Sequence, residues 1–149
     1  MYKSCRVAVI IPAHNEERFI GEVIRTIPSF VDYMIVVDDC SQDRTSQVAA
    51  SQKDQRVLVL KTPHRQGVGG AMLIGYRKAL ELGSDIIVKM DGDGQMPPEH
   101  LPSLLDAIIE QGYDYAKGNR FLVGNFLATM PRNRLVGNIL LTFITKFGF

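Results

Sequence analysis

The sequence is poor in cysteine and carries almost no net charge. Its 149 residues include two cysteines, Cys5 and Cys40, too few for a disulfide framework and typical of a reduced, cytosolic protein. A formal net charge of +1 gives no general attraction to nucleic acid, so no nucleic-acid partner is expected. No apolar run approaches the roughly 20 residues of a membrane-spanning helix, and residues 1–6 are too polar for a signal peptide.

Apolar runs of strand length alternate with segments of helical periodicity along the whole chain. The length and an apolar content of 46% predict one globular domain over residues 1–149. Strands are expected over residues 6–12, 33–37, 57–60, 86–90 and 113–117. Helices are expected between them, so the pattern predicts an α/β fold with a largely parallel sheet.

Two helix starts have features that a structure can test. Asn15 is expected to cap the helix that follows the first strand. The helix after the third expected strand is expected over residues 67–82, with Gly83 at its end. Its first glycines lack the Lys-Ser/Thr of a phosphate-binding loop, so close packing on the sheet is the favoured interpretation. Its buried face is expected to contain Val68, Met72, Tyr76, Ala79 and Leu80.

The fourth expected strand ends in two carboxylates one residue apart, Asp91 and Asp93. Ligands of open α/β sheets bind at the carboxyl ends of the strands. Two carboxylates this close repel each other unless a cation lies between them, so a divalent metal is expected. Gly92 and Gly94 allow the backbone to come close to a ligand.

Other expected strand ends carry polar residues as well. Residues 14–16 follow the first strand, Asp38 and Asp39 the second, and Arg120 the fifth. Because the carboxyl ends of parallel strands meet at one edge, these side chains are expected to converge on one site.

At these positions the sequence resembles the family 2 glycosyltransferases, in particular the dolichyl- and polyprenyl-phosphate mannose synthases and related polyprenyl-phosphate sugar transferases. The motifs that carry the resemblance keep their order and spacing over residues 11–16, 37–45, 67–75, 91–99, 118–120 and 131–138. The resemblance implies the A-type nucleotide-sugar-binding fold. It also implies a truncated chain, because the family continues with an acceptor-side segment. His14 stands where tyrosine is usual, and Cys40 where glycine is common.

The resemblance implies an inverting transfer of a sugar from GDP-mannose or a UDP-sugar to polyprenyl or dolichyl phosphate. Asp39 would hydrogen-bond the nucleobase, which can be uracil or guanine. Asp91 and Asp93, with Gln95 as a third oxygen ligand, would hold Mg²⁺ or Mn²⁺ against the diphosphate. Together with Arg120, which could pair with a phosphate, these two aspartates would carry catalysis. The remaining residues of the nucleotide site would be Pro12, His14, Glu16, Val37 and Gly92.

The end of the chain suggests contact with a lipid or with another chain. Arg132 and Arg134 could meet a lipid phosphate, or simply begin a basic helix beside a membrane. Residues 135–149 are apolar on most sides of a helix, so a membrane surface, another copy or further sequence is expected to cover them. The expected location is cytoplasmic, at the cytoplasmic face of a membrane.

Several alternatives stay open at the level of sequence. Transfer to a saccharide hydroxyl would need a general base, and none is evident. A haloacid-dehalogenase-type phosphatase also uses an Asp-x-Asp pair, but usually on its first strand and with a downstream lysine and acidic pair. A phospho-receiver module would need an aspartate on the strand at residues 57–61, which has none. A nucleotide-binding fragment without turnover is the last alternative.

Overall fold

The computed structural model of the chain describes residues 1–118. The chain divides into two compact units, residues 1–113 and residues 114–149, and all the described helices and strands lie in the first unit. Arg120, Arg132, Arg134 and the apolar segment 135–149 lie outside the described residues. The roles expected for them therefore stay predictions.

Strands and helices alternate along the first unit, as expected. They are β1 (Val7–Ala13), α1 (Ile20–Thr26), β2 (Tyr33–Asp38), α2 (Thr45–Ala50), β3 (Val57–Lys61), α3 (Gly67–Glu81), β4 (Ile86–Lys89), the short 3₁₀ helix η1 (Pro98–His100) and α4 (Leu101–Ile109). The four strands form one sheet in the order β3-β2-β1-β4, with every pairing parallel. This confirms the prediction of an α/β fold with a parallel sheet.

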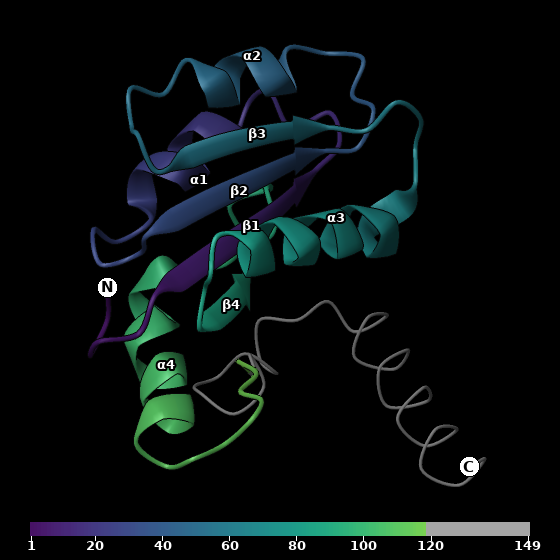
Figure 1. The fold of residues 1–149 in the computed structure, drawn as a ribbon. Coiled ribbons are helices and arrows are strands. Elements are labelled where there is room, and N and C mark those ends of the chain that lie inside the picture. Colours follow the sequence, from purple (N-terminus) through teal and green to yellow (C-terminus); the bar gives the residue numbers. More distant parts are fainter. Residues whose placement is uncertain (119–149) are drawn as a thin grey trace, which may run out of the picture. The chain divides into compact units, whose positions relative to one another are not determined.

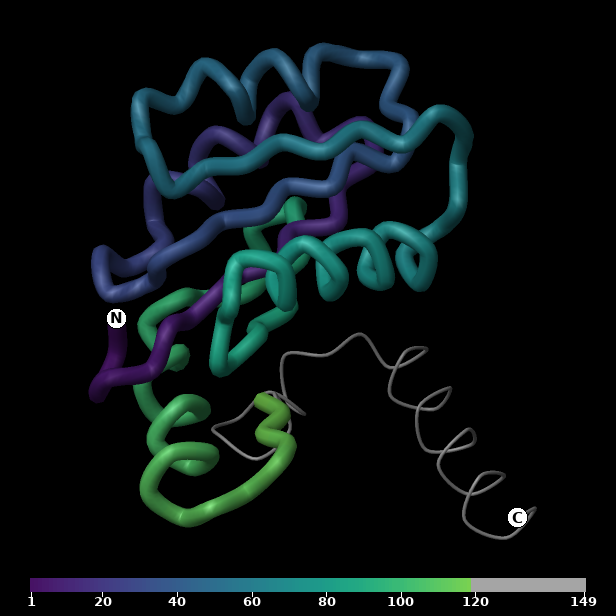
Figure 2. The backbone as a smooth tube through the Cα atoms, in the orientation of Figure 1, coloured from purple at the N-terminus to yellow at the C-terminus, as the bar shows by residue number. Residues whose placement is uncertain are grey.

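The path of the chain creates a crevice beside β1. The chain first adds β2 and then β3 on one side of β1, and α3 then carries it back so that β4 pairs with the other side (Figure 2). Ile10 of β1 therefore lies between Ile35 of β2 and Lys89 of β4. A reversal of strand order of this kind opens a crevice at the carboxyl ends of the two strands involved. The candidate site is expected there, between β1 and β4.

The sheet is covered on both faces, which explains why its central strand is a continuous apolar run. Residues Val7 to Ile11 are completely buried. One face packs against α1, α2 and α4, and the other against α3, which crosses in front of β1 in Figure 1. A Cβ atom placed on Gly75 of α3 would lie 2.4 Å from Cγ2 of Ile10. The helix can therefore lie this close to the sheet only because glycine occupies that position.

The expected buried face of α3 was partly wrong. Met72 and Ala79 are buried as expected, but Val68, Tyr76 and Leu80 are 60%, 43% and 67% exposed. The helix instead turns its small residues toward the sheet, with Ala71 and Gly75 also buried. Small side chains allow the helix to approach β1 and β2 closely. The face of α3 that is buried is therefore the one with the smallest side chains, and hydrophobicity alone does not determine it.

The expected fifth strand over residues 113–117 was also wrong, since those residues form no strand. A strand exists only where a neighbouring strand supplies its backbone hydrogen bonds. Within the described residues the sheet ends at β4, whose one partner is β1. Among the helices of residues 1–118, none is both long enough and apolar enough to cross a membrane.

Candidate functional site

A cleft of about 190 Å³ opens where the carboxyl ends of β1, β2 and β4 meet the start of α3. Parallel pairing brings these ends to one edge, so the expected convergence of the first, second and fourth strand ends is confirmed. The cleft is lined by Pro12, Ala13, His14, Asp39, Arg65, Gly67, Val68, Ala71 and Asp91.

Asn15 joins the loop after β1 to the turn after β2. Its backbone has φ of +59°, a left-handed conformation that asparagine tolerates. Its backbone N–H donates to Oγ of Ser41 over 2.9 Å, and its Oδ1 accepts from the backbone N–H of Gln42 over 2.9 Å. The expected helix cap by Asn15 was wrong, because α1 begins only at Ile20 and its first turn is preceded by Phe19 without a side-chain cap. The asparagine tethers two loops of the cleft instead.

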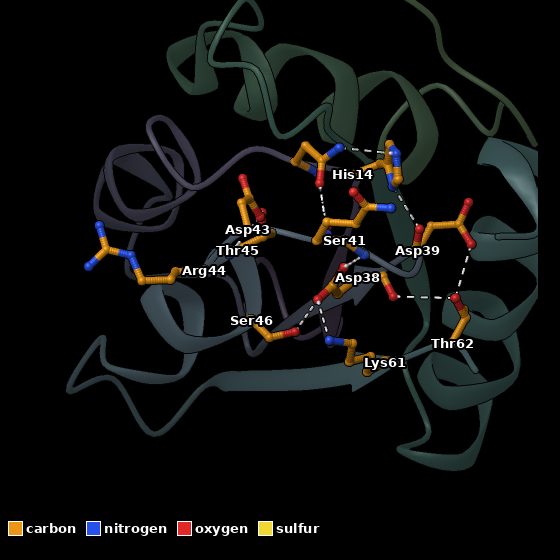
Figure 3. Close-up of polar contacts among 12 residues, drawn as sticks. His14, Asp38, Asp39, Ser41, Asp43, Arg44, Thr45, Ser46, Lys61 and Thr62 are labelled. Carbon is orange, nitrogen blue, oxygen red and sulfur yellow. Dashed lines mark hydrogen bonds and ion pairs between the residues drawn. The ribbon is translucent and has the colours of Figure 1, made fainter. Parts of the chain in front are cut away.

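His14 holds the ends of β1 and β2 together. Its Nδ1 lies 2.8 Å from the carbonyl oxygen of Asp39 (Figure 3). Its Nε2 lies 3.3 Å from Nδ2 of Asn15. A carbonyl only accepts and an amide nitrogen only donates, so this pair of contacts selects the tautomer with the proton on Nδ1. The ring lines the cleft in a fixed orientation.

Asp39 is buried and ionised at the base of the cleft. It is 4% exposed, and its carboxylate accepts hydrogen bonds from Thr62, Gln66 and Gly67. Burial alone would raise the pKa of this carboxyl, but these hydrogen bonds outweigh it and hold the pKa below its usual value. The carboxylate therefore secures the start of α3 while it also lines the cleft.

Asp38 has a structural role distinct from that of its neighbour. It is 1% exposed, and its carboxylate accepts from the backbone N–H of Ser41 over 2.8 Å and from the hydroxyl of Ser46 (Figure 3). Cys40 follows with φ of +58°, in the left-handed region that favours glycine. Asp38 thus shapes the turn after β2, which leaves Asp39 as the carboxylate of this pair that lines the cleft.

The carboxylate turn after β4 packs against the end of β1. Gly92 is buried, and a Cβ added to it would lie 3.4 Å from Cβ of Ala13 and 3.5 Å from Cγ of Glu16. Asp91 pairs with the ammonium of Lys89, and Oδ1 of Asp93 accepts from the backbone N–H of Gln95 over 3.0 Å. The turn is therefore held by its own backbone, with both carboxylates at least partly accessible.

Glu16 is a third carboxylate beside this turn. Burial and the nearby negative charges of Asp93, Asp43 and Asp91 raise the pKa of its side chain. In residues 1–118, no group of three or more His, Cys, Asp or Glu side chains is arranged to hold a metal ion. The protein ligands expected for a metal are thus two aspartates and an amide, a small oxygen set of the kind Mg²⁺ accepts when phosphates and water complete its shell.

The cleft also contains residues that were not expected at a ligand site. Arg65 lies in the loop between β3 and α3, and Val68 and Ala71 lie on the first turns of α3. The position of Arg65 in a basic loop after a strand end was the feature of the sequence that could have indicated its place in the cleft. Val37, which was expected to line a nucleoside, is completely buried in the core under α3.

Comparison with known proteins gives one consistent family. The model of Glycosyl transferase family 2 matches residues 8–148. The chain is 34% identical over 154 residues to UDP-N-acetylglucosamine–dolichyl-phosphate N-acetylglucosaminyltransferase of Methanococcus voltae, covering 93% of this chain and 61% of that protein. It is 37% identical over 138 residues to polyprenol monophosphomannose synthase of Mycolicibacterium smegmatis, covering 88% and 51%. The chain thus spans about half to three-fifths of the length of these relatives.

Solved structures confirm the A-type fold. Glucosyl-3-phosphoglycerate synthase from Mycobacterium tuberculosis, in complex with Mn²⁺, UDP and glucosyl-3-phosphoglycerate, matches with a TM-score of 0.58 at 29% identity, over 71% of this chain and 40% of that one. Mannosyl-3-phosphoglycerate synthase from Rubrobacter xylanophilus matches with a TM-score of 0.59 at 24% identity, over 71% and 37%.

Proposed function

The chain belongs to glycosyl transferase family 2, and from that premise we propose that it binds a nucleoside-diphosphate sugar in the cleft and serves transfer of the sugar to polyprenyl or dolichyl phosphate. The observation that carries the proposal is the meeting of Asp39, Arg65 and Asp91 in one cleft at the carboxyl edge of the sheet. Relatives of similar sequence are named for transfer to dolichyl or polyprenyl phosphate, which supports this acceptor class.

The cleft offers different chemistry at its two ends. Asp39 presents a carboxylate, which can accept from the N–H groups of a nucleobase. Arg65 presents a guanidinium, whose planar donors suit phosphate oxygens. Asp91 lies at the end of β4, on the far side of β1 from Asp39. We propose that the base binds at Asp39 and that the diphosphate lies between Arg65 and Asp91.

Asp91, Asp93 and Gln95 would hold a Mg²⁺ or Mn²⁺ ion. The donor set fits such a cation, because it consists of oxygen ligands and leaves positions for phosphate oxygens and water. Burial and the negative charges of Asp93, Asp43 and Asp91 raise the pKa of Glu16, so the turn carries carboxylates that a cation would stabilise, and the Lys89 ammonium already lies against Asp91. When bound, the ion would neutralise charge on the diphosphate leaving group. A structure of similar fold was solved with Mn²⁺ and UDP, which supports the use of a divalent metal.

The acceptor side depends on residues outside the described part of the chain. We propose that Arg120 pairs with a phosphate of the donor or acceptor, and that Arg132 and Arg134 meet the lipid phosphate. A polyprenyl phosphate is already anionic near neutral pH, so the transfer would need no dedicated general base. A lipid acceptor also places the reaction at a membrane surface, which we propose to be the cytoplasmic face, with segment 135–149 as the contact.

Calorimetry of UDP and GDP binding, with and without Mn²⁺, tests the proposal. We expect binding of at least one nucleotide to require the metal. In Asp91→Asn and Asp93→Asn, Mn²⁺ should no longer increase the affinity for the nucleotide, so most of the affinity should be lost. Glu81→Gln, an exposed change at the end of α3, is the matched control and should bind as the wild type does. Absence of binding of either nucleotide at millimolar concentration, by protein shown to be folded, would overturn the proposal.

A further inference from the structure

The hydrogen bonds of Asp39 leave little of its carboxylate free. Its Oδ1 accepts from the hydroxyl of Thr62 over 3.0 Å and from the backbone N–H of Gln66 over 2.8 Å. Its Oδ2 accepts from the backbone N–H of Gly67 over 2.7 Å. An ionised carboxylate has about four acceptor positions, two on each oxygen. Oδ1 is therefore saturated, and one position remains on Oδ2.

These three donors are fixed by the fold. Thr62 is 3% exposed, and its backbone N–H donates to the carbonyl of Asp38 over 3.0 Å, so its hydroxyl is held against Asp39 (Figure 3). The other two donors are backbone groups at the start of α3. A ligand that requires an acceptor position on both oxygens of Asp39 would have to displace a buried hydrogen bond, and that carries an unfavourable free energy.

The nucleobases differ in the number of N–H groups that they present to a carboxylate. Guanine presents two adjacent donors, N1–H and the 2-amino group, which pair best with both oxygens. Uracil presents the single donor N3–H. A carboxylate with one free position on one oxygen therefore fits the single donor of uracil better than the two adjacent donors of guanine.

We propose that the donor base is uracil, and that Thr62 enforces this choice by saturating Oδ1 of Asp39. The inference rests on the proposed function, because it requires a nucleotide in the cleft with its base at Asp39. It narrows the donor from GDP- or UDP-linked sugars to UDP-linked sugars. Thr62 is in this sense a positioning residue, since it acts on the base through Asp39.

Base discrimination by Thr62 variants tests the inference. Calorimetry with UDP and GDP in the presence of Mn²⁺ gives the ratio of the two dissociation constants. For the wild type we expect UDP to bind about tenfold tighter or more, the size expected for a hydrogen bond to a charged group. Thr62→Ala removes the hydroxyl without placing another atom there and frees a position on Oδ1, so the preference should fall to within about threefold. Thr62→Ser keeps the hydroxyl and should keep the preference.

The outcomes separate this inference from the proposed function. Equal or tighter binding of GDP by the wild type would overturn the choice of uracil and leave nucleotide binding intact. Equal weakening of both nucleotides in Thr62→Ala, with the ratio unchanged, would show a purely structural threonine and also overturn the inference. Binding of neither nucleotide by the folded wild type would instead overturn the proposed function.

Discussion

Lys89 and Asp91, two residues apart at the end of β4, form an ion pair in which Nζ lies 2.5 Å from Oδ1. Alternate residues of a strand project to the same face, so the end of β4 carries its own cation beside the carboxylate turn. Both side chains are more than one-third exposed, so the pair contributes little to stability. The ion pair does affect metal binding, because a metal ion at the turn must share Asp91 with the Lys89 ammonium or displace the ammonium.

Lys89→Gln should therefore raise the affinity for Mn²⁺ in the absence of nucleotide. Removal of the ammonium leaves Asp91 available and increases the negative charge around Asp93 and Glu16. For an exposed pair the expected gain is about two- to fivefold. Titration of free Mn²⁺ followed by electron paramagnetic resonance measures it directly. Lys78→Gln, which removes a lysine that pairs with Glu81 on α3, is the control and should have no effect. Unchanged or weaker binding in Lys89→Gln would contradict the prediction.

The stability of the fold should decline in acid through Asp39, which is buried, and Asp43, which is half-buried. Asp43 accepts from the backbone N–H and hydroxyl of Thr45 and from the backbone N–H of Glu17. Burial raises its pKa, but these bonds outweigh burial and lower it, as they do for Asp39. A carboxyl with a folded pKa below its unfolded value of about 3.9 stabilises the protein above that value. This contribution is lost as the pH falls through about 4 toward the folded pKa.

Urea unfolding at a series of pH values measures this loss. Between about pH 6 and pH 3 the free energy of unfolding should fall for the wild type and fall less steeply for Asp43→Asn. The variant should also be less stable at pH 7, by about 1–2 kcal/mol, because the amide of asparagine has one acceptor oxygen where the carboxylate has two. Glu99→Gln, a change of an exposed carboxylate, should reproduce the wild-type slope. A slope in Asp43→Asn equal to that of the wild type would show that Asp43 makes no contribution.

Close packing of α3 on the sheet can be tested at two glycines of the same helix. An added Cβ at position 75 would meet Ile10, which is completely buried and has no room to move. Gly75→Ala should therefore destabilise the fold by about 1–3 kcal/mol or more. At Gly69 nothing lies within 4 Å of an added Cβ, so Gly69→Ala should be neutral or stabilising by up to about 1 kcal/mol. Thermal melts of the two variants give the comparison, and a Gly75→Ala protein as stable as Gly69→Ala would refute it.

The strands were predictable because both faces of the sheet are covered. A central parallel strand must be apolar throughout, so the run at residues 6–12 located β1 to within one residue of Val7–Ala13. The convergence of Asp39 and Asp91 on one cleft followed from parallel topology and the positions of the strand ends. These features depend on local patterns and on one general rule of α/β sheets.

The contacts between loops were not predictable. Nothing in the sequence pairs Asp39 with Thr62 or with the backbone of Gln66 and Gly67, which lie more than 20 residues away. The face that α3 buries depends on how closely it can approach Ile10, and apolar periodicity does not encode that distance. Side chains that reach a site through long-range contacts between loops therefore cannot be assigned to it from the sequence alone. Arg65 is the example with the most direct consequence for ligand binding.

Arg65→Gln should weaken binding of UDP and leave binding of uridine unchanged. The guanidinium lines the cleft from the loop before α3, where it can pair with phosphate but adds nothing to recognition of the base at Asp39. Because Arg65 is exposed, the loss should be about three- to tenfold, and it should shrink at high salt as screening weakens the pair. Calorimetry of both ligands at low and high salt measures the effect, with Arg77→Gln on the exposed side of α3 as the control. Equal weakening of uridine and UDP would place Arg65 at the base end of the cleft and contradict the assignment of the diphosphate.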